Sequence, residues 1–189
     1  MMEYRICNGK QVRVAISGKS GCGNTTVSSL LAKKINVTMI NYTFRSLAQE
    51  FGLSLAQIIE QAKTDDSFDI KVDTKQVELA KEDSCVLGSR LAIWMLKEAD
   101  LKVYLYADDN VRAQRILNRE GGNLEDIKAF TQMRDTQDSA RYKKLYDIDN
   151  NQYDFCDMII DTSLYNPEQI TEQIIQELCK KGFIEPCSC

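Results

Sequence analysis

A glycine-rich loop between a predicted strand and a predicted helix is the feature that most constrains the fold of this chain. Residues 11–17 (QVRVAIS) form a short apolar run rich in β-branched side chains, and residues 24–34 repeat apolar side chains at helical spacing. The loop between them consists of Gly18, Lys19, Ser20, Gly21, Cys22, Gly23, Asn24, Thr25 and Thr26. Its spacing matches the phosphate-binding pattern G-x-x-x-x-G-K-[ST], except that Asn24 stands at the lysine position. We name residues 18–26 the phosphate loop.

The chemistry of the phosphate loop follows from its backbone and a few side chains. Glycines allow consecutive backbone N–H groups to face one phosphate, and the positive end of the following helix favours the same anion. The hydroxyl of Thr25 is suited to ligate the Mg²⁺ that accompanies ATP, whereas Asn24 removes the cation that a lysine supplies. Lys19 either replaces that charge or remains a solvated loop residue. The structural alternative is a glycine-rich turn that binds no ligand.

Strands and helices alternate along the rest of the sequence. The apolar runs predict further strands at residues 37–40, 85–87, 101–106 and 158–160. The longer amphipathic segments predict helices at residues 44–51, 55–62, 68–81, 108–120, 124–145 and 166–179. This order predicts a three-layer α/β/α sandwich with a parallel sheet, in which ligands bind at the carboxyl ends of the strands. The length of 189 residues predicts one domain.

The composition excludes several classes of function. The chain contains no histidine, so histidine-based catalytic dyads, triads and metal sites are ruled out. A net charge of −4 argues against nucleic-acid or polybasic membrane binding, and no apolar run is long enough to span a bilayer. Seven scattered cysteines favour a reducing cytoplasm. We therefore expect a cytoplasmic protein without a nucleic-acid or membrane partner. We also expect it to be a monomer.

Several motifs beyond the phosphate loop resemble one family. They are residues 41–48 (NYTFRSLA), 69–73 (DIKVD), 86–95 (VLGSRLAIWM), 111–116 (VRAQRI) and 134–142 (RDTQDSARY). In this order they are similar to the short, archaeal-like cytidylate kinases, which are P-loop nucleoside monophosphate kinases. The resemblance covers about residues 11–180. It implies a single kinase domain over residues 1–189, with a monophosphate-binding insert at about 42–82 and a lid at about 121–145.

The resemblance implies transfer of the γ-phosphate of ATP, with Mg²⁺, to CMP or dCMP. It assigns the acceptor to Arg45, Asp73 and Arg90, and the first and last of these lie at predicted loop–helix junctions. Bidentate guanidinium groups suit a phosphate. The lid-like run carries Arg134 and Arg141 with Asp138 between them on one helical face, and we expect them to neutralise the transferring phosphate while the carboxylate orders the arginines.

Some residues depart from the family or allow another interpretation. Gly88 stands where the family usually carries an acidic residue. The helix over residues 108–120 lies outside the cleft in related kinases, so we expect Arg115 and Arg119 to form hinge or surface ion pairs. Trp94 is predicted to be a core residue, and the terminal Cys-Ser-Cys a tail. Two alternative functions remain: a kinase for a different monophosphate, and a non-catalytic nucleotide-binding protein descended from such kinases.

Overall fold

The computed structural model describes residues 4–187 and contains two sheets. The strands are β1 (Tyr4–Ile6), β2 (Arg13–Gly18), β3 (Thr38–Ile40), β4 (Cys85–Gly88), β5 (Leu101–Tyr106), β6 (Met158–Asp161) and β7 (Ile184–Pro186). Five of them pair in parallel in the order β3-β4-β2-β5-β6, whereas β1 and β7 pair antiparallel with each other.

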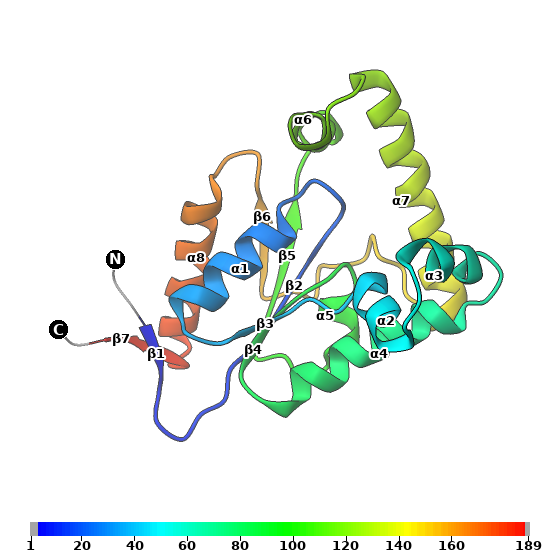
Figure 1. Ribbon diagram of the computed structural model, residues 1–189. Coiled ribbons are helices and arrows are strands. Elements are labelled where there is room, and N and C mark those ends of the chain that lie inside the picture. Colours follow the sequence, from blue (N-terminus) through cyan, green and yellow to red (C-terminus); the bar gives the residue numbers. More distant parts are fainter. Residues whose placement is uncertain (1–3, 188–189) are drawn as a thin grey trace.

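Helices lie on both faces of the five-stranded sheet (Figure 1). They are α1 (Asn24–Lys34), α2 (Phe44–Phe51), α3 (Leu55–Ala62), α4 (Ser67–Glu82), α5 (Ala92–Met95), α6 (Asp109–Glu120), α7 (Leu124–Tyr146) and α8 (Pro167–Lys180). One face packs against α1 and α8 through a cluster that includes Val14, Leu31 and Ile174. The opposite face packs against α4 and α5 through a cluster that includes Leu87 and Ile93. The predicted three-layer sandwich is confirmed.

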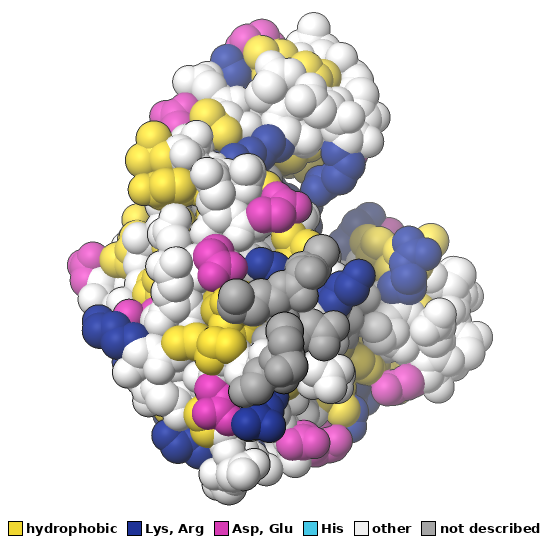
Figure 2. All heavy atoms as spheres, turned by 90° about the vertical axis from the view of Figure 1, so that its left-hand side faces the viewer, with side chains coloured by type: hydrophobic (Ala, Val, Ile, Leu, Met, Phe, Trp, Pro, Cys, Tyr) yellow, Lys and Arg dark blue, Asp and Glu magenta, His cyan; other side chains and the backbone are white. Residues whose placement is uncertain are grey.

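Two groups of helices extend away from this sandwich. Helices α2, α3 and α4 share a small core of their own, built around Leu47, Ile58 and Val72. Helix α6 lies above the carboxyl ends of the strands in Figure 1, and α7 begins beside it and runs down toward α3. A notch hollows the surface below the part of the molecule that carries α6 and the start of α7, and Lys and Arg side chains, dark blue in Figure 2, border it.

The short elements near the chain ends and after β4 are absent from the sequence prediction. Strands β1 and β7 have three residues each and pair with each other from opposite ends of the chain, with Tyr4 opposite Pro186. Helix α5 has four residues, too few to show a helical period. The predicted tail lies largely outside the described residues, with only Cys187 inside them. Between residues 4 and 187 no helix has both the length and the apolar character needed to cross a membrane.

Candidate active site

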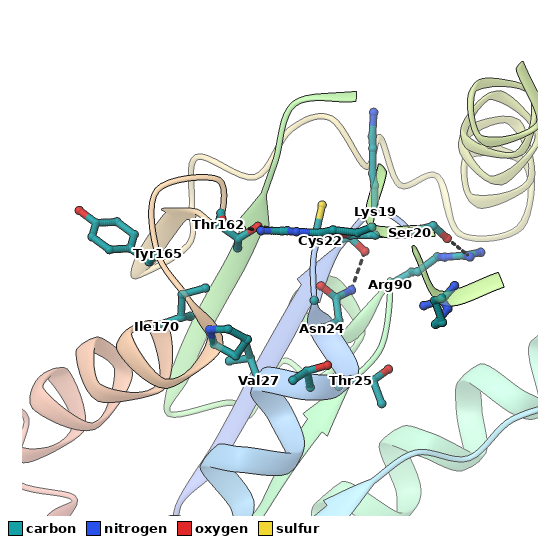
Figure 3. A pocket seen from close by; sticks show the side chains of 18 of the residues that line it. Lys19, Ser20, Cys22, Asn24, Thr25, Val27, Arg90, Thr162, Tyr165 and Ile170 are labelled. Carbon is teal, nitrogen blue, oxygen red and sulfur yellow. Dashed lines mark hydrogen bonds between the residues drawn. The ribbon is translucent and has the colours of Figure 1, made fainter. Parts of the chain in front are cut away.

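The phosphate loop follows β2 and is held in shape by glycine backbones and by Asn24. Gly21 and Gly23 have φ angles of +84° and +97°, a backbone region that residues other than glycine rarely adopt. Asn24 donates from Nδ2 to the carbonyl oxygen of Gly18 at 2.6 Å, which ties the end of the loop to its beginning (Figure 3). The residue at the lysine position therefore braces the loop but brings no charge to it.

The loop borders a cavity of about 500 Å³. Thr25 and Thr26 are exposed at its wall, and Lys19 extends away from Thr25 in Figure 3. At the other end of the cavity from Arg90 lies Tyr165, which follows β6. The cavity is thus elongated, with the phosphate loop along its length and an aromatic side chain at one end.

Position 88 is closed to any larger side chain by Ser28 of α1. A Cβ atom added to Gly88 would lie 2.4 Å from Ser28 Oγ and 2.8 Å from Ser28 Cβ. Ser28 therefore occupies the space that a side chain at position 88, where the family usually carries an acidic residue, would need. Within residues 4–187 no cluster of three or more Cys, Asp or Glu side chains could hold a metal ion.

Helix α6 lies against the phosphate loop, so the expectation that this helix is outside the cleft is wrong, and Arg115 is not the surface ion-pair residue that was one of its two expected roles. Its Nη1 donates to the carbonyl of Gly21 at 3.3 Å and to Thr162 Oγ1 at 2.8 Å. Arg119 pairs with Glu120 at the surface, as expected, but it also lines the cavity. The spacing of these arginines is visible in the sequence. The position of α6 against the loop is not, because it depends on tertiary packing.

Arg90 meets the phosphate loop and the lid-like helix at one point. Ser17, fully buried at the end of β2, donates to the carbonyl of Ser89 and accepts from the N–H of Ile93, which fixes the turn that carries Arg90. Arg90 donates to Ser20 Oγ at 2.7 Å and to Asp138 Oδ2 at 2.5 Å. Because β4 and β2 are neighbours in the sheet, their carboxyl ends bring Arg90 beside the loop.

Asp138 on α7 orders two arginines, but they are not the predicted pair. It binds Arg90 and, through Oδ1, Arg141 at 3.0 Å, while Arg141 also pairs with Asp69 of α4 at 3.2 Å. Arg134 is exposed and has no ion pair within the described part of the chain. The expectation that Asp138 orders both Arg134 and Arg141 is therefore correct only for Arg141, and Arg90 takes the second place.

Asp73 is linked to the same helix. Tyr146, at the end of α7, donates from its hydroxyl to Asp73 Oδ2 at 2.8 Å. Burial raises the pKa of Asp73 to about 6, although the bond from Tyr146 and the charge of Arg141 both act to lower it. This carboxyl group therefore changes charge close to neutral pH.

Arg45, Trp94 and Cys22 are also singled out in the sequence, and they range from exposed to buried. Arg45 on α2 is exposed and forms no ion pair among residues 4–187. Trp94 packs against the core beside Tyr104 with a ring-centroid distance of 6.1 Å, as predicted. Cys22 is buried, and burial raises the pKa of its thiol, so this cysteine is a poor nucleophile despite its place at a helix N-terminus.

Comparison with known proteins gives a consistent result. Residues 13–164 match the cytidylate kinase-like family. The chain is 42% identical to cytidylate kinase 2 of Borreliella burgdorferi over 176 residues, which covers 91% of this chain and 98% of that protein. It is 40% identical to the cytidylate kinase of Pyrococcus abyssi, over 83% and 88% of the two chains. A shikimate kinase from Acinetobacter baumannii shares the fold, with a TM-score of 0.63 at 18% identity over 91% and 95%.

Proposed function

The chain belongs to the cytidylate kinase-like family, and from this premise we propose that it transfers the γ-phosphate of ATP to CMP or dCMP. The observation that carries the proposal is the junction of Arg90, Ser20 and Asp138, at which a predicted acceptor arginine lies within hydrogen-bond distance of the phosphate loop. An acceptor phosphate bound to Arg90 would be adjacent to the phosphates of a donor on that loop.

The donor would lie along the cavity. Backbone N–H groups of residues 18–26 and the N-terminus of α1 bind its phosphates. Its base points toward the end lined by Tyr165, and Arg115 and Arg119 border the path between them. Together with Arg90 and Lys19, these arginines are the cations that line the cavity, and they compensate for the charge that Asn24 lacks.

Mg²⁺ would enter as the ATP complex, and Thr25 is the residue suited to ligate it. This ion usually keeps several water ligands and binds through substrate phosphates. The cavity wall agrees with this, because its lining among residues 4–187 offers the Thr25 hydroxyl but no carboxylate cluster. When bound, Mg²⁺ neutralises part of the charge on the donor phosphates.

The acceptor would be held by Arg45, Arg90 and Asp73, and the lid would supply Arg134 and Arg141. In the transfer step an oxygen of the acceptor phosphate forms a bond to the γ-phosphorus, and the bond from that phosphorus to the β–γ bridging oxygen breaks to release ADP. The attacking oxygen is already an anion, so the reaction requires no general base. The protein contributes positioning and positive charge, which a chain without histidine can supply.

The test is an incubation of the protein with Mg-ATP and, separately, CMP, dCMP, UMP, AMP and GMP, followed by measurement of ADP. We expect ADP with CMP or dCMP and little with the other three. ADP with a different acceptor would keep the kinase and change its substrate. Absence of ADP with all five, from a protein that binds ATP, would contradict the proposal in favour of a non-catalytic nucleotide-binding protein.

A further inference from the structure

Arg112 of α6 is a buried cation whose side chain is only 2% exposed. Its Nε donates to the carbonyl of Ser20, Nη1 donates to Asp109 and Nη2 donates to Asp135, each at 2.8 Å. All three nitrogens are therefore paired. Pairing with carboxylates and a carbonyl is the condition under which a buried guanidinium is tolerated, and it makes the position of this side chain sensitive to each partner.

The two carboxylates that bind Arg112 differ in exposure and in origin. Asp109 lies three residues earlier on the same helix and is 62% exposed, so its pair with Arg112 is screened by water. Asp135 is 17% exposed and belongs to α7, the helix of the predicted lid. The planar guanidinium of Arg112 thus joins the phosphate loop, through Ser20, to α7, through Asp135, in a fixed relative direction.

The backbone of the phosphate loop rests directly on Arg112. A Cβ atom added to Gly21 would lie 2.8 Å from the carbonyl oxygen of Arg112. In a trans peptide the carbonyl and the following N–H point in opposite directions. The bond from Arg112 to the Ser20 carbonyl therefore turns the N–H of Gly21 away from Arg112 and fixes its orientation.

We propose that Arg112 is a positioning residue that couples α7 to the binding of the donor phosphates. Through Ser20 it orients the Gly21 amide, whose N–H is a hydrogen-bond donor to phosphate in the loop. Through Asp135 it makes that orientation depend on the position of α7. The inference rests on the proposed function, because it takes the phosphate loop as the ATP site. It adds a residue whose role is exerted through the loop backbone and not by contact with the nucleotide.

The test compares Asp135→Asn with Asp109→Asn, which remove one carboxylate charge each from the same guanidinium. For Asp135→Asn we expect the Kd of a non-hydrolysable ATP analogue and the KM for ATP to rise about tenfold, the loss typical of a charged hydrogen bond. The Kd of CMP, measured without ATP or its analogue, stays within about twofold of the wild-type value, since the acceptor does not contact the loop amide. Asp109→Asn leaves all three constants within about twofold.

A merely structural role gives a different pattern. If Asp135→Asn lowers the thermal midpoint but leaves the Kd of the ATP analogue unchanged, the proposal is wrong. It is also wrong if the variant raises the Kd of the ATP analogue and the Kd of CMP measured alone by equal factors. If Asp135→Asn fails to fold, the same binding and kinetic constants are measured for Asp135→Glu, which keeps the charge but displaces it by one methylene. The binding titration needs no phosphoryl transfer. A wild-type protein that binds the analogue without forming CDP would thus refute the proposed function and leave this comparison valid.

Discussion

At the scale of single residues, Arg90 offers the most direct test of the acceptor site. Removing its guanidinium by Arg90→Ala takes away the group that joins Ser20 to Asp138, and we expect kcat/KM for CMP to fall at least about a hundredfold, or about 3 kcal/mol. Asp138 keeps its pair with Arg141, so no buried charge is left alone and the thermal midpoint shifts by less than about 4 °C.

The control for this prediction is Arg5→Ala, which removes an exposed arginine paired with Glu185 in the small terminal sheet. It should leave both kcat/KM and the thermal midpoint unchanged, because exposed pairs contribute little. Arg90→Lys should recover part of the activity, since it returns the charge without the bidentate geometry. Normal turnover by Arg90→Ala would remove this residue from the site.

The raised pKa of Asp73 makes the stability of the folded protein depend on pH. Its pKa in the folded protein is about 6, above the ordinary value of 3.8, because burial disfavours the charged form. As the pH falls from 7.5 to 5, the folded protein takes up a proton at Asp73 that the unfolded chain does not yet bind. Asp73 therefore makes the wild type gain stability on acidification.

The measurement is the difference in thermal midpoint between Asp73→Asn and the wild type at several pH values. The amide of the variant can still accept the bond from Tyr146 but cannot ionise. We expect the variant to be relatively most stable at pH 7.5, with the difference shrinking toward pH 5 and a midpoint near 6. A difference that does not change over this range would show that Asp73 has an ordinary pKa.

At the scale of elements, the turn between α6 and α7 depends on glycine. Gly121 has φ +74° and ψ −169°, a conformation that is essentially restricted to glycine. Gly121→Ala meets no atom within 4 Å, so its cost of about 1–3 kcal/mol is conformational. We expect it to lower the thermal midpoint and also to change kcat severalfold, because the turn sets the direction of α7.

Gly9→Ala is the matched control for this turn. Gly9 also has a positive φ, +76°, and open space around it, but it lies in the loop after β1. It should lower the thermal midpoint without altering kcat. If Gly121→Ala also leaves kcat unchanged, the turn is not a hinge for the reaction.

Elements with a strong local signal could be predicted from the sequence, and those that depend on distant partners could not. The phosphate loop is a contiguous motif, and the alternating strands and helices carry their periods within a few residues. Strand β1 has three residues and pairs with β7, about 180 positions further along the chain, so its partner cannot be seen in the local sequence. In the site, the arginine spacing on α6 is visible, but the bond from Arg112 to Ser20 joins residues 92 positions apart. The same holds for Arg90 and Asp138, which are 48 positions apart.

At the scale of the whole molecule, α7 is attached to both halves of the proposed site by polar contacts. Asp135 reaches the phosphate loop through Arg112, while Arg141 and Tyr146 bind Asp69 and Asp73 on α4. A ligand that repositions α7 from one side therefore changes the geometry on the other side. Since binding free energies are linked reciprocally, the ATP analogue and CMP should each strengthen the binding of the other by the same factor.

Titration calorimetry of CMP with and without a saturating non-hydrolysable ATP analogue measures this factor. We expect the Kd of CMP to fall at least about fivefold, the lower range of site–site coupling. Asp69→Asn weakens the attachment of α7 to α4 and should reduce the factor, whereas Lys63→Ala removes an exposed pair within the α3 region and should leave it intact. Equal CMP affinities with and without the analogue would mean that the two ligands bind independently. In that case the polar attachments of α7 would only hold the helix in place and would transmit nothing between the two halves of the site.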